Sequence, residues 1–240
     1  MEGAAWEELI VAFRAVFGAK NRRHPIRVSF SALLRVTDDD RYVLFDSPAR
    51  PSSYGPPGGV LKIHPPAVRI LESWGFQPDR TVEGANRMKG DLRGILPADS
   101  LRAFQEWFDT AAYRESATEC LRRELREEMS EVGLGSPGSS IGSLTFDPIR
   151  TVREGPSEVP GKPYLQLRNF EVYELAMRTP AAIRLRRDLV EAGHDEERPG
   201  VICAGFADIA HGRLGRALIA PQSAFLAGST RLTADLPSLR

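Results

Sequence analysis

The stretch AAYRESATECLRRELREEM, from Ala111 to Met129, predicts the helix on which the rest of the fold depends. Residues three and four positions apart lie on one face of a helix. The carboxylates of Glu124, Glu127 and Glu128 should therefore share one patch of its surface. On another side, apolar residues repeat every four positions and should anchor the helix in a core: Leu121, Leu125 and Met129. The stretch thus predicts a helix that is buried on one side and acidic on another.

The acidic patch has two interpretations. Like charges on one helix face repel each other, which is unfavourable unless a positive group lies among them. Carboxylate oxygens suit Mg²⁺ and Mn²⁺, so a bound divalent cation is one explanation. The other is a solvated helix whose charges pair along its surface, such as Glu119 with Arg123 four residues later. The helix residues alone leave both interpretations open.

The spacing of these charges resembles the signature of the Nudix hydrolases. That signature is Gly, five residues, Glu, seven residues, and then Arg-Glu-U-x-Glu-Glu-x-Gly-U, where U is a bulky aliphatic residue. Glu115, seven residues and the run from Arg123 to Glu128 match it without a gap. There are two departures from the signature. Gly59 is the best match to its first glycine, so residues 60–114 replace the short spacer, and the closing glycine, Gly133, comes three residues late.

The resemblance implies a fold and a domain organisation. The fold is an α/β/α sandwich with a mixed sheet, and a large insertion separates the Gly-Gly strand from the catalytic helix. Residues 1–25 are expected to form an N-terminal amphipathic helix, and residues 26–228 the Nudix-like domain, with the insertion at 63–112. Residues 229–240 are expected to form a C-terminal tail.

The resemblance also implies a metal-dependent hydrolase that cleaves a pyrophosphate bond in a nucleoside diphosphate linked to another moiety. The catalytic residues would be Glu124, Glu127 and Arg123, with Arg123 orienting the glutamates through a salt bridge. The ligands of Mg²⁺ or Mn²⁺ would be Glu124, Glu127, Glu128, Glu115 and the main-chain carbonyl of Gly59. Glu115 would complete the metal patch or hold Arg123. The candidate substrate-binding residues are Gly58, Lys89, Arg93 and Arg87.

Simpler explanations stand beside these assignments. A tight turn at the start of a strand explains Gly58-Gly59 equally well, and a solvent-facing edge strand explains the basic residues 87–93. The buried-looking segment 68–76 and an apolar stripe in residues 101–108 indicate that the insertion is folded. Cys120, within the key helix, is expected to serve packing rather than chemistry.

The layout of the insertion resembles a narrower group, the Nudix domains encoded beside bacterial cyclic-nucleotide synthases in antiphage signalling. The resemblance is carried by Gly58-Gly59, by the folded insertion and by Asp91-Leu92-Arg93-Gly94 ahead of residues 101–108. It opens an alternative function, a module that senses a nucleotide or cyclic nucleotide and cleaves it weakly or not at all. A third alternative is a structural interaction domain that binds neither nucleotide nor metal.

Composition excludes several partners. The 240 residues suffice for one domain with a sizeable core. Basic and acidic side chains balance at 32 each, which argues against duplex nucleic acid or an anionic membrane as a partner. Two cysteines without metal-ligand spacing, and the lack of a signal peptide or a long apolar run, fit a cytoplasmic protein. A nucleotide-type small molecule is the expected partner, and the N-terminal helix and the insertion are candidate homodimer surfaces.

The remaining elements follow from periodicity and turn residues. Strands are expected at residues 27–36, 41–45, 60–62, 89–96, 144–152, 164–175 and 201–204, and further helices at 101–108, 179–192 and 221–226. Residues 47–57, 135–142 and 153–162 are expected to be irregular, the last as a loop that arches over a substrate, and residues 207–209 to form a turn.

Overall fold

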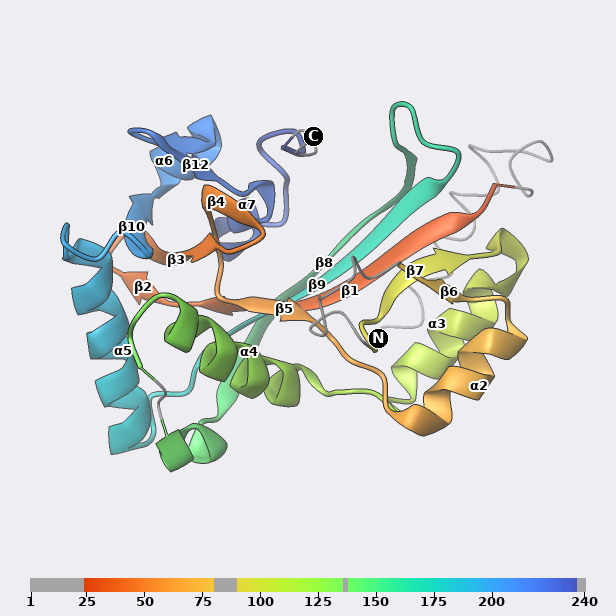
Figure 1. Cartoon of the computed structure of the whole chain (residues 1–240), viewed down its shortest axis with the longest axis horizontal. Coiled ribbons are helices and arrows are strands. Elements are labelled where there is room, and N and C mark those ends of the chain that lie inside the picture. The colour runs from red at the N-terminus through yellow and green to blue at the C-terminus, as the bar shows by residue number, and fades with distance from the viewer. Residues whose placement is uncertain (1–23, 80–89, 136–137, 237–240) are drawn as a thin grey trace. The chain divides into compact units, whose positions relative to one another are not determined.

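A computed structural model describes residues 24–79, 90–135 and 138–236 (Figure 1). The predicted N-terminal helix, Arg87 and Lys89 lie outside the described residues. The described part contains α2 (Pro65–Ser73), α3 (Leu101–Asp109), α4 (Ala117–Glu131), α5 (Pro180–His194), α6 (Phe206–His211), α7 (Ala224–Ala227) and the 3-10 helices η2 (Ala98–Ser100), η3 (Gly138–Ser143) and η4 (Pro221–Ser223). None of the helices in these three ranges is both long and apolar enough to cross a membrane.

Twelve strands of the described residues form two six-stranded sheets. The strands are β1 (Ile26–Arg35), β2 (Thr37–Asp38), β3 (Arg41–Ser47), β4 (Arg50–Gly55), β5 (Gly58–Val60), β6 (Gln77–Pro78), β7 (Arg93–Leu96), β8 (Phe146–Glu158), β9 (Leu165–Leu175), β10 (Val201–Gly205), β11 (Arg213–Leu214) and β12 (Ala217–Ile219). The order is β6-β7-β1-β9-β8 in one sheet, with β5 on β1, and β10-β3-β4-β12-β11 in the other, with β2 on β3. The predicted mixed α/β class is confirmed.

The chain divides into two compact units. Of the described residues, unit 1 comprises those up to Phe30 and those within Val60–Glu115 and Arg153–Asn169. Unit 2 comprises the described residues within Ser31–Gly59 and Ser116–Val152 and those from Phe170 onward. Strands β1, β5, β8 and β9 therefore contribute residues to both units.

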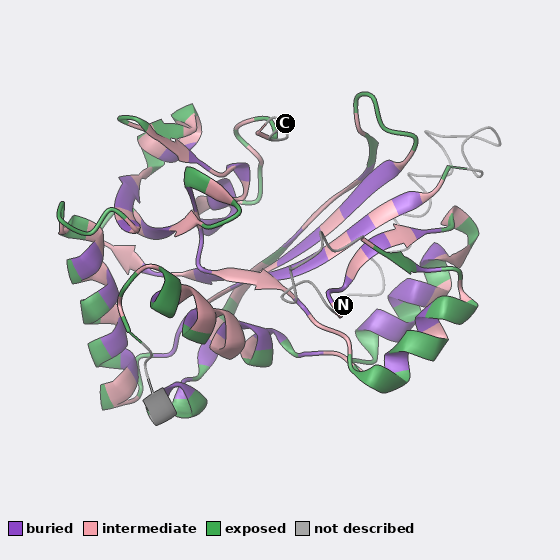
Figure 2. Cartoon of the chain, in the orientation of Figure 1, coloured by how far each residue is buried: buried purple, intermediate pink, exposed green. Residues whose placement is uncertain are grey.

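The core of unit 1 is aromatic. The predicted stripe of α3 is buried, since Leu101, Phe104, Trp107 and Phe108 are each at most 7% exposed. The ring of Phe30 on β1 lies 5.3 Å from that of Phe104 and 4.4 Å from that of Phe108, measured between centroids. These contacts hold α3 against the sheet, and Figure 2 shows buried residues on the inward sides of both α2 and α3.

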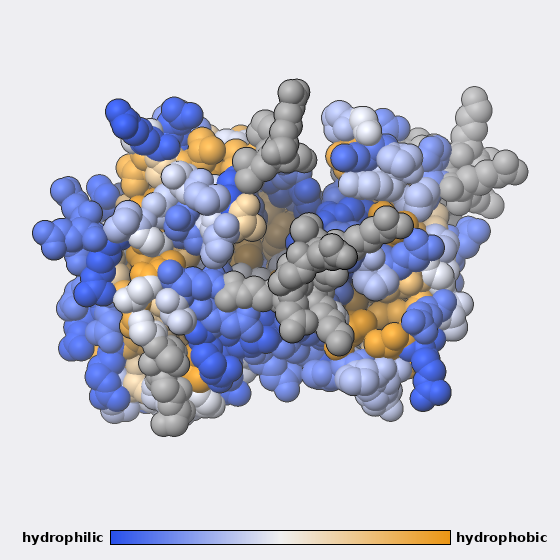
Figure 3. All heavy atoms as spheres, viewed as in Figure 1, coloured by the Kyte–Doolittle hydropathy of each residue, from blue (hydrophilic) through white to orange (hydrophobic). Residues whose placement is uncertain are grey.

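Unit 2 has its own core, in which residues of β9, β10 and α7 meet. The ring of Phe170 lies 4.9 Å from that of Phe225, and both belong to one cluster of buried residues with Val172 and Ala204. Helix α5 begins as predicted, with the Thr179 hydroxyl accepting a hydrogen bond from the Ala182 N–H. One side of α5 is buried, while its outer surface is hydrophilic (Figures 2 and 3).

Several expected boundaries are wrong. The key helix starts at Ala117 rather than Ala111, because Ala111 and Tyr113 have φ of 56° and 60°, outside the right-handed helical range. Residues 207–209 lie in helix α6 rather than a turn, and part of 135–142 forms η3.

Two segments that were expected to be irregular are strands. Strand β4 forms within 47–57 because it pairs with β3 on one side and with β12 on the other, so tertiary pairing overrides its Pro/Ser-rich composition. Strand β8 continues to Glu158, which removes most of the loop expected at 153–162. Gly155 and Pro156 are tolerated there because β8 is the last strand in its sheet's order.

Candidate active site

Helix α4 begins at a capping box. The hydroxyl of its N-cap, Ser116, accepts a hydrogen bond from the Glu119 N–H at 3.3 Å, and the Glu119 carboxylate accepts one from the Ser116 N–H at 2.7 Å. This reciprocal pair fixes the first turn. It also leaves Glu115 outside the helix, in the segment that enters it.

The rotation of α4 about its axis is set by its buried side. Leu121, Leu125 and Met129 are at most 5% exposed, which confirms the predicted apolar stripe. Arg122 adds a second anchor, since its guanidinium donates two hydrogen bonds, of 3.0 and 2.6 Å, to the Leu144 carbonyl. With this side fixed, the acidic residues of α4 have a fixed direction.

The Glu128 carboxylate faces the backbone of Gly58. Its Oε2 atom accepts a hydrogen bond from the Gly58 N–H at 2.8 Å. Gly58 has φ of 129°, and a Cβ atom there would lie 2.2 Å from the Ala32 carbonyl oxygen. Glycine is therefore required at this position both for its backbone conformation and for the close approach of β1.

The next residue, Gly59, lies against Glu124. A Cβ atom on Gly59 would lie 2.0 Å from Oε1 of Glu124. The Gly59 carbonyl oxygen accepts a hydrogen bond from the Cys120 thiol, with Sγ and oxygen 3.5 Å apart. The two glycines thus bring main-chain groups of β5 directly onto the acidic side of α4.

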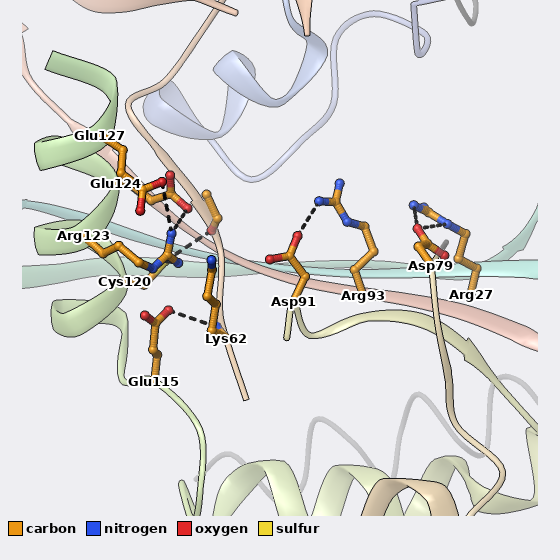
Figure 4. A network of polar contacts seen from close by, with 11 residues as sticks. Arg27, Lys62, Asp79, Asp91, Arg93, Glu115, Cys120, Arg123, Glu124 and Glu127 are labelled. Carbon is orange, nitrogen blue, oxygen red and sulfur yellow. Dashed lines mark hydrogen bonds and ion pairs between the residues drawn. The ribbon is translucent and has the colours of Figure 1, made fainter. Parts of the chain in front are cut away.

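Arg123 lies among the carboxylates, as Figure 4 shows. Its Nη1 atom lies 2.6 Å from Oε1 of Glu124 and 4.0 Å from Oε2 of Glu127. The side chains of Arg123 and Glu124 are only 17% and 16% exposed, so water screens this ion pair less than one on the open surface. The predicted salt bridge between Arg123 and the glutamates is present.

The surroundings of Glu128 change the proton affinity of its carboxyl, first through burial and then through nearby charges. Burial raises the pKa of its carboxyl well above the ordinary value, and the charges of Glu124 and Glu127 raise it further. The hydrogen bond from Gly58 and the charge of Arg123 act in the opposite direction without cancelling this. Glu124 and Glu127 therefore lie close enough to Glu128 to oppose its ionisation.

The carboxylates do not converge on one point. Among the described residues, no three His, Cys, Asp or Glu side chains are arranged to hold a metal ion together. Glu124 is held by Arg123 and Glu128 by Gly58, and the assignment of these carboxylates as metal ligands stays a prediction. The donor set still fits Mg²⁺ or Mn²⁺, because carboxylate oxygens and a main-chain carbonyl are the ligands that hard cations prefer. A cation would also relieve the repulsion that raises the pKa of Glu128.

Glu115, another predicted ligand, lies in unit 1 and is 8% exposed. Its Oε2 atom accepts a hydrogen bond from the Lys62 N–H at 2.9 Å, and its own N–H donates to the Lys62 carbonyl at 2.7 Å (Figure 4). The guanidinium of Arg114 donates to the carbonyls of Glu115 and Phe108. The segment that enters α4 is thus fixed by main-chain hydrogen bonds within unit 1.

Of the predicted substrate-binding cations, the structure describes Arg93. Its Nη2 atom lies 2.7 Å from Oδ2 of Asp91, in unit 1 (Figure 4). Asp91 is buried, and its backbone pairs with that of Lys62. Arg93 therefore has an acidic partner within its own unit, and its part in substrate binding stays a prediction.

Sequence reasoning missed two features of this region. The thiol of Cys120, expected only to pack, hydrogen-bonds to the Gly59 carbonyl and accepts a hydrogen bond from Arg123. The main chain of Lys62 holds Glu115. The bond from Cys120 to Gly59 and the bond from Lys62 to Glu115 leave no local signal, because each joins residues more than 50 positions apart. Cys120 and Arg123 are three positions apart on one helix, so their contact did have a local signal. The start of α4 did have a signal, the Ser116-x-x-Glu119 capping box.

The model of a family described as the SMODS-associated NUDIX domain matches residues 25–227 of the chain. The matched region contains the signature residues of α4 as well as the Gly58-Gly59 pair that faces them. No curated protein and no solved structure matches the chain.

Proposed function

Because the chain belongs to the SMODS-associated Nudix domain family, which is linked to nucleotide-synthase defence systems, we propose that it is a Nudix-type pyrophosphohydrolase. It would use Mg²⁺ or Mn²⁺ to cleave the pyrophosphate bond of a nucleoside diphosphate linked to another moiety. The substrate is a nucleotide-type small molecule, consistent with a chain of zero net charge rather than a basic nucleic-acid-binding protein.

One observation carries the proposal: the fit between the Gly58-Gly59 backbone and the acidic side of α4. Any side chain at Gly59 would collide with Glu124, and Gly58 donates its N–H to Glu128. A solvated helix has no need of such an approach, because its charges would face water. Two consecutive glycines held against two carboxylates favour a site over a solvated surface.

The residues have distinct tasks in this proposal. Glu124, Glu127, Glu128 and the Gly59 carbonyl would hold the cation, with Glu115 as a further ligand. When bound, Mg²⁺ or Mn²⁺ would supply positive charge for the pyrophosphate and a lowered pKa for the attacking water. Arg123 would orient Glu124 and Glu127 through its ion pairs. Glu124 is the first candidate for the base that accepts a proton from the attacking water. Glu127 is the second candidate, and it would first have to leave its ion pair with Arg123.

Gly58, Arg93, Lys89 and Arg87 remain the candidates for substrate binding. A guanidinium binds phosphate oxygens through two parallel hydrogen bonds, which suits Arg93 and Arg87 to a pyrophosphate. Arg93 would have to exchange or share its carboxylate partner, Asp91, when a substrate binds.

A substrate screen tests the proposal. Nucleoside-diphosphate sugars, dinucleoside polyphosphates, NAD and ADP-ribose would each be incubated with the full chain and Mg²⁺ or Mn²⁺, and products separated by chromatography. We expect at least one to be cleaved at the pyrophosphate. The variant Glu127→Gln with Glu128→Gln should lose this activity while keeping its circular dichroism spectrum. Turnover by the double variant at the wild-type rate would refute the assignment of these residues.

The alternative function, a nucleotide or cyclic-nucleotide sensor in a defence system, has one observation in its favour. The carboxylates of α4 are already held by Arg123 and Gly58 rather than arranged around a common point. Saturable binding of a nucleotide with no product, in the presence of either metal, would support the sensor over the hydrolase. The family's association with SMODS systems fits either function.

A further inference from the structure

The thiol of Cys120 occupies the centre of a chain of polar contacts on the acidic side of α4. Its Sγ atom lies 3.5 Å from the Gly59 carbonyl oxygen, to which it donates, and 3.6 Å from Nη2 of Arg123, from which it accepts. Through its other terminal nitrogen, Arg123 reaches Oε1 of Glu124 at 2.6 Å. One buried thiol thus connects a strand carbonyl with the arginine that holds Glu124 (Figure 4).

We propose that Cys120 is a positioning residue that sets the direction of the Gly59 carbonyl and of the Arg123 guanidinium. This inference rests on the proposed function, in which both groups belong to a cation site. Cys120 does not bind the cation or the substrate itself. It acts through its two neighbours.

The hydrogen-bonding capacity of a carbonyl supports this role. A main-chain carbonyl oxygen has two lone pairs, and one of them is engaged by the Cys120 S–H. Because the thiol is buried and belongs to the same helix as Arg123 and Glu124, its S–H holds this carbonyl in a fixed direction relative to both side chains. A thiol is a weak donor, so it steers the carbonyl without competing strongly for its charge.

The position of Cys120 on α4 supports the same role. It lies three residues before Arg123 and four before Glu124, so these side chains share one side of the helix. Cys120 is fully buried, and water cannot replace either of its hydrogen bonds. An apolar residue of the same size would fill the space and leave the Gly59 carbonyl without this donor.

Three substitutions of Cys120 distinguish a role in positioning its neighbours from a role in packing alone. Cys120→Ser keeps a donor and an acceptor, Cys120→Val fills the space without polarity, and Cys120→Ala does neither. The dissociation constant of Mn²⁺ would be measured on each full-length variant by titration calorimetry, and thermal unfolding recorded alongside. If Cys120 served packing alone, the Val variant would resemble the wild type more closely than the Ser variant.

We expect the opposite result, in which the Mn²⁺ dissociation constant of the Ser variant is closer to that of the wild type than the constant of the Val variant is. The Ser variant should bind within about twofold of the wild type, and the Val and Ala variants about 10-fold more weakly, the lower end of the range for groups that orient ligands. Cys203→Ser, at the other buried cysteine, is the matched control and should leave the constant unchanged. Equal constants for the Ser and Val variants, or tighter binding by Val, would overturn the role. If the wild type binds no Mn²⁺, the proposed function itself fails.

A spectroscopic measurement serves if the Cys120 variants fold poorly. The Cys203→Ser protein retains a single thiol, so its infrared S–H stretching band reports Cys120 alone. The band should shift when Mn²⁺ is added, because the carbonyl that accepts the S–H bond would then also bind the cation. A band that stays in place at saturating Mn²⁺, while calorimetry shows binding, would contradict the proposal.

Discussion

The backbone of Gly59 lies so close to the carboxylate of Glu124 that a single added methyl group would come within 2.0 Å of Oε1. In Gly59→Ala, Glu124 must therefore swing away from Arg123, and the end of a flexible side chain can do so without unfolding the helix. We expect Mn²⁺ affinity and hydrolysis to fall about 10- to 100-fold, as when ligand orientation is lost, with a small change in melting temperature. Gly142→Ala is the matched control, because nothing lies within 4 Å of the added atom. Wild-type activity in Gly59→Ala would remove Glu124 from the site.

The raised pKa of Glu128 predicts the pH dependence of stability in metal-free protein. Because the folded state holds this proton more tightly than the unfolded state, ionising Glu128 destabilises the fold. The Glu128→Gln variant should match the wild type at pH below about 4, the ordinary range of a glutamate. It should then become increasingly more stable than the wild type as pH rises toward the raised pKa.

Urea unfolding at a series of pH values, with a chelator present, measures this difference. Saturating Mg²⁺ should reverse its sign at neutral pH by stabilising the wild type alone. A difference that does not vary with pH would show that the environment of Glu128 does not oppose its ionisation.

The capping box of α4 predicts a local effect on stability. Ser116→Ala removes the side-chain acceptor of the Glu119 N–H and should lower the free energy of unfolding by about 1 kcal/mol. Ser100→Ala makes the same chemical change at the N-cap of α3, where no side-chain cap bond exists, and should change stability by less than about 0.5 kcal/mol. Chemical denaturation of both variants provides the comparison. Equal losses would mean that the box contributes nothing specific.

Burial controls the reactivity of Cys203. It raises the pKa of this thiol to about 11, with a further increase from Asp38 and a decrease from Arg41. Only about one molecule in a thousand would then carry the reactive thiolate at pH 8. Iodoacetamide should therefore label Cys203 in native protein far more slowly than in denaturant, as mass spectrometry of the modified peptides can determine. Rapid labelling under native conditions would place this thiol in contact with solvent.

The sequence predicted those parts of the fold that depend on local spacing. The buried stripe of α4 follows from helical periodicity and the Thr179 cap of α5 from its residue type, and both are present. The ion pairs of Arg123 are also present, but their prediction came from the family resemblance. Strand β4 could not be predicted in this way, because its Pro/Ser-rich residues become a strand only through pairing with β3 and β12. The early start expected for α4 failed for a different reason. Ala111 and Tyr113 adopt left-handed conformations, which cannot be predicted from alanine or tyrosine as residue types.

In the candidate site, too, the features that depend on local spacing were predictable and those that depend on tertiary contacts were not. The acidic residues on one face were predictable, as was the requirement for glycine at residues 58 and 59, which came from the family resemblance. The individual partners were not. That Glu128 would pair with a main-chain N–H, and that a thiol would connect Gly59 with Arg123, depends on how β5 meets α4.

The hydrogen bond from Gly58 to Glu128 spans 70 positions of the sequence. A synthetic peptide of residues 116–131 would therefore contain all the charged residues of α4 and lack the main-chain groups that face them. Grafted onto an unrelated scaffold, such a helix would behave as an ordinary acidic surface. A graft designed to transfer the proposed cation site would therefore have to include the Gly58-Gly59 strand in its register with α4.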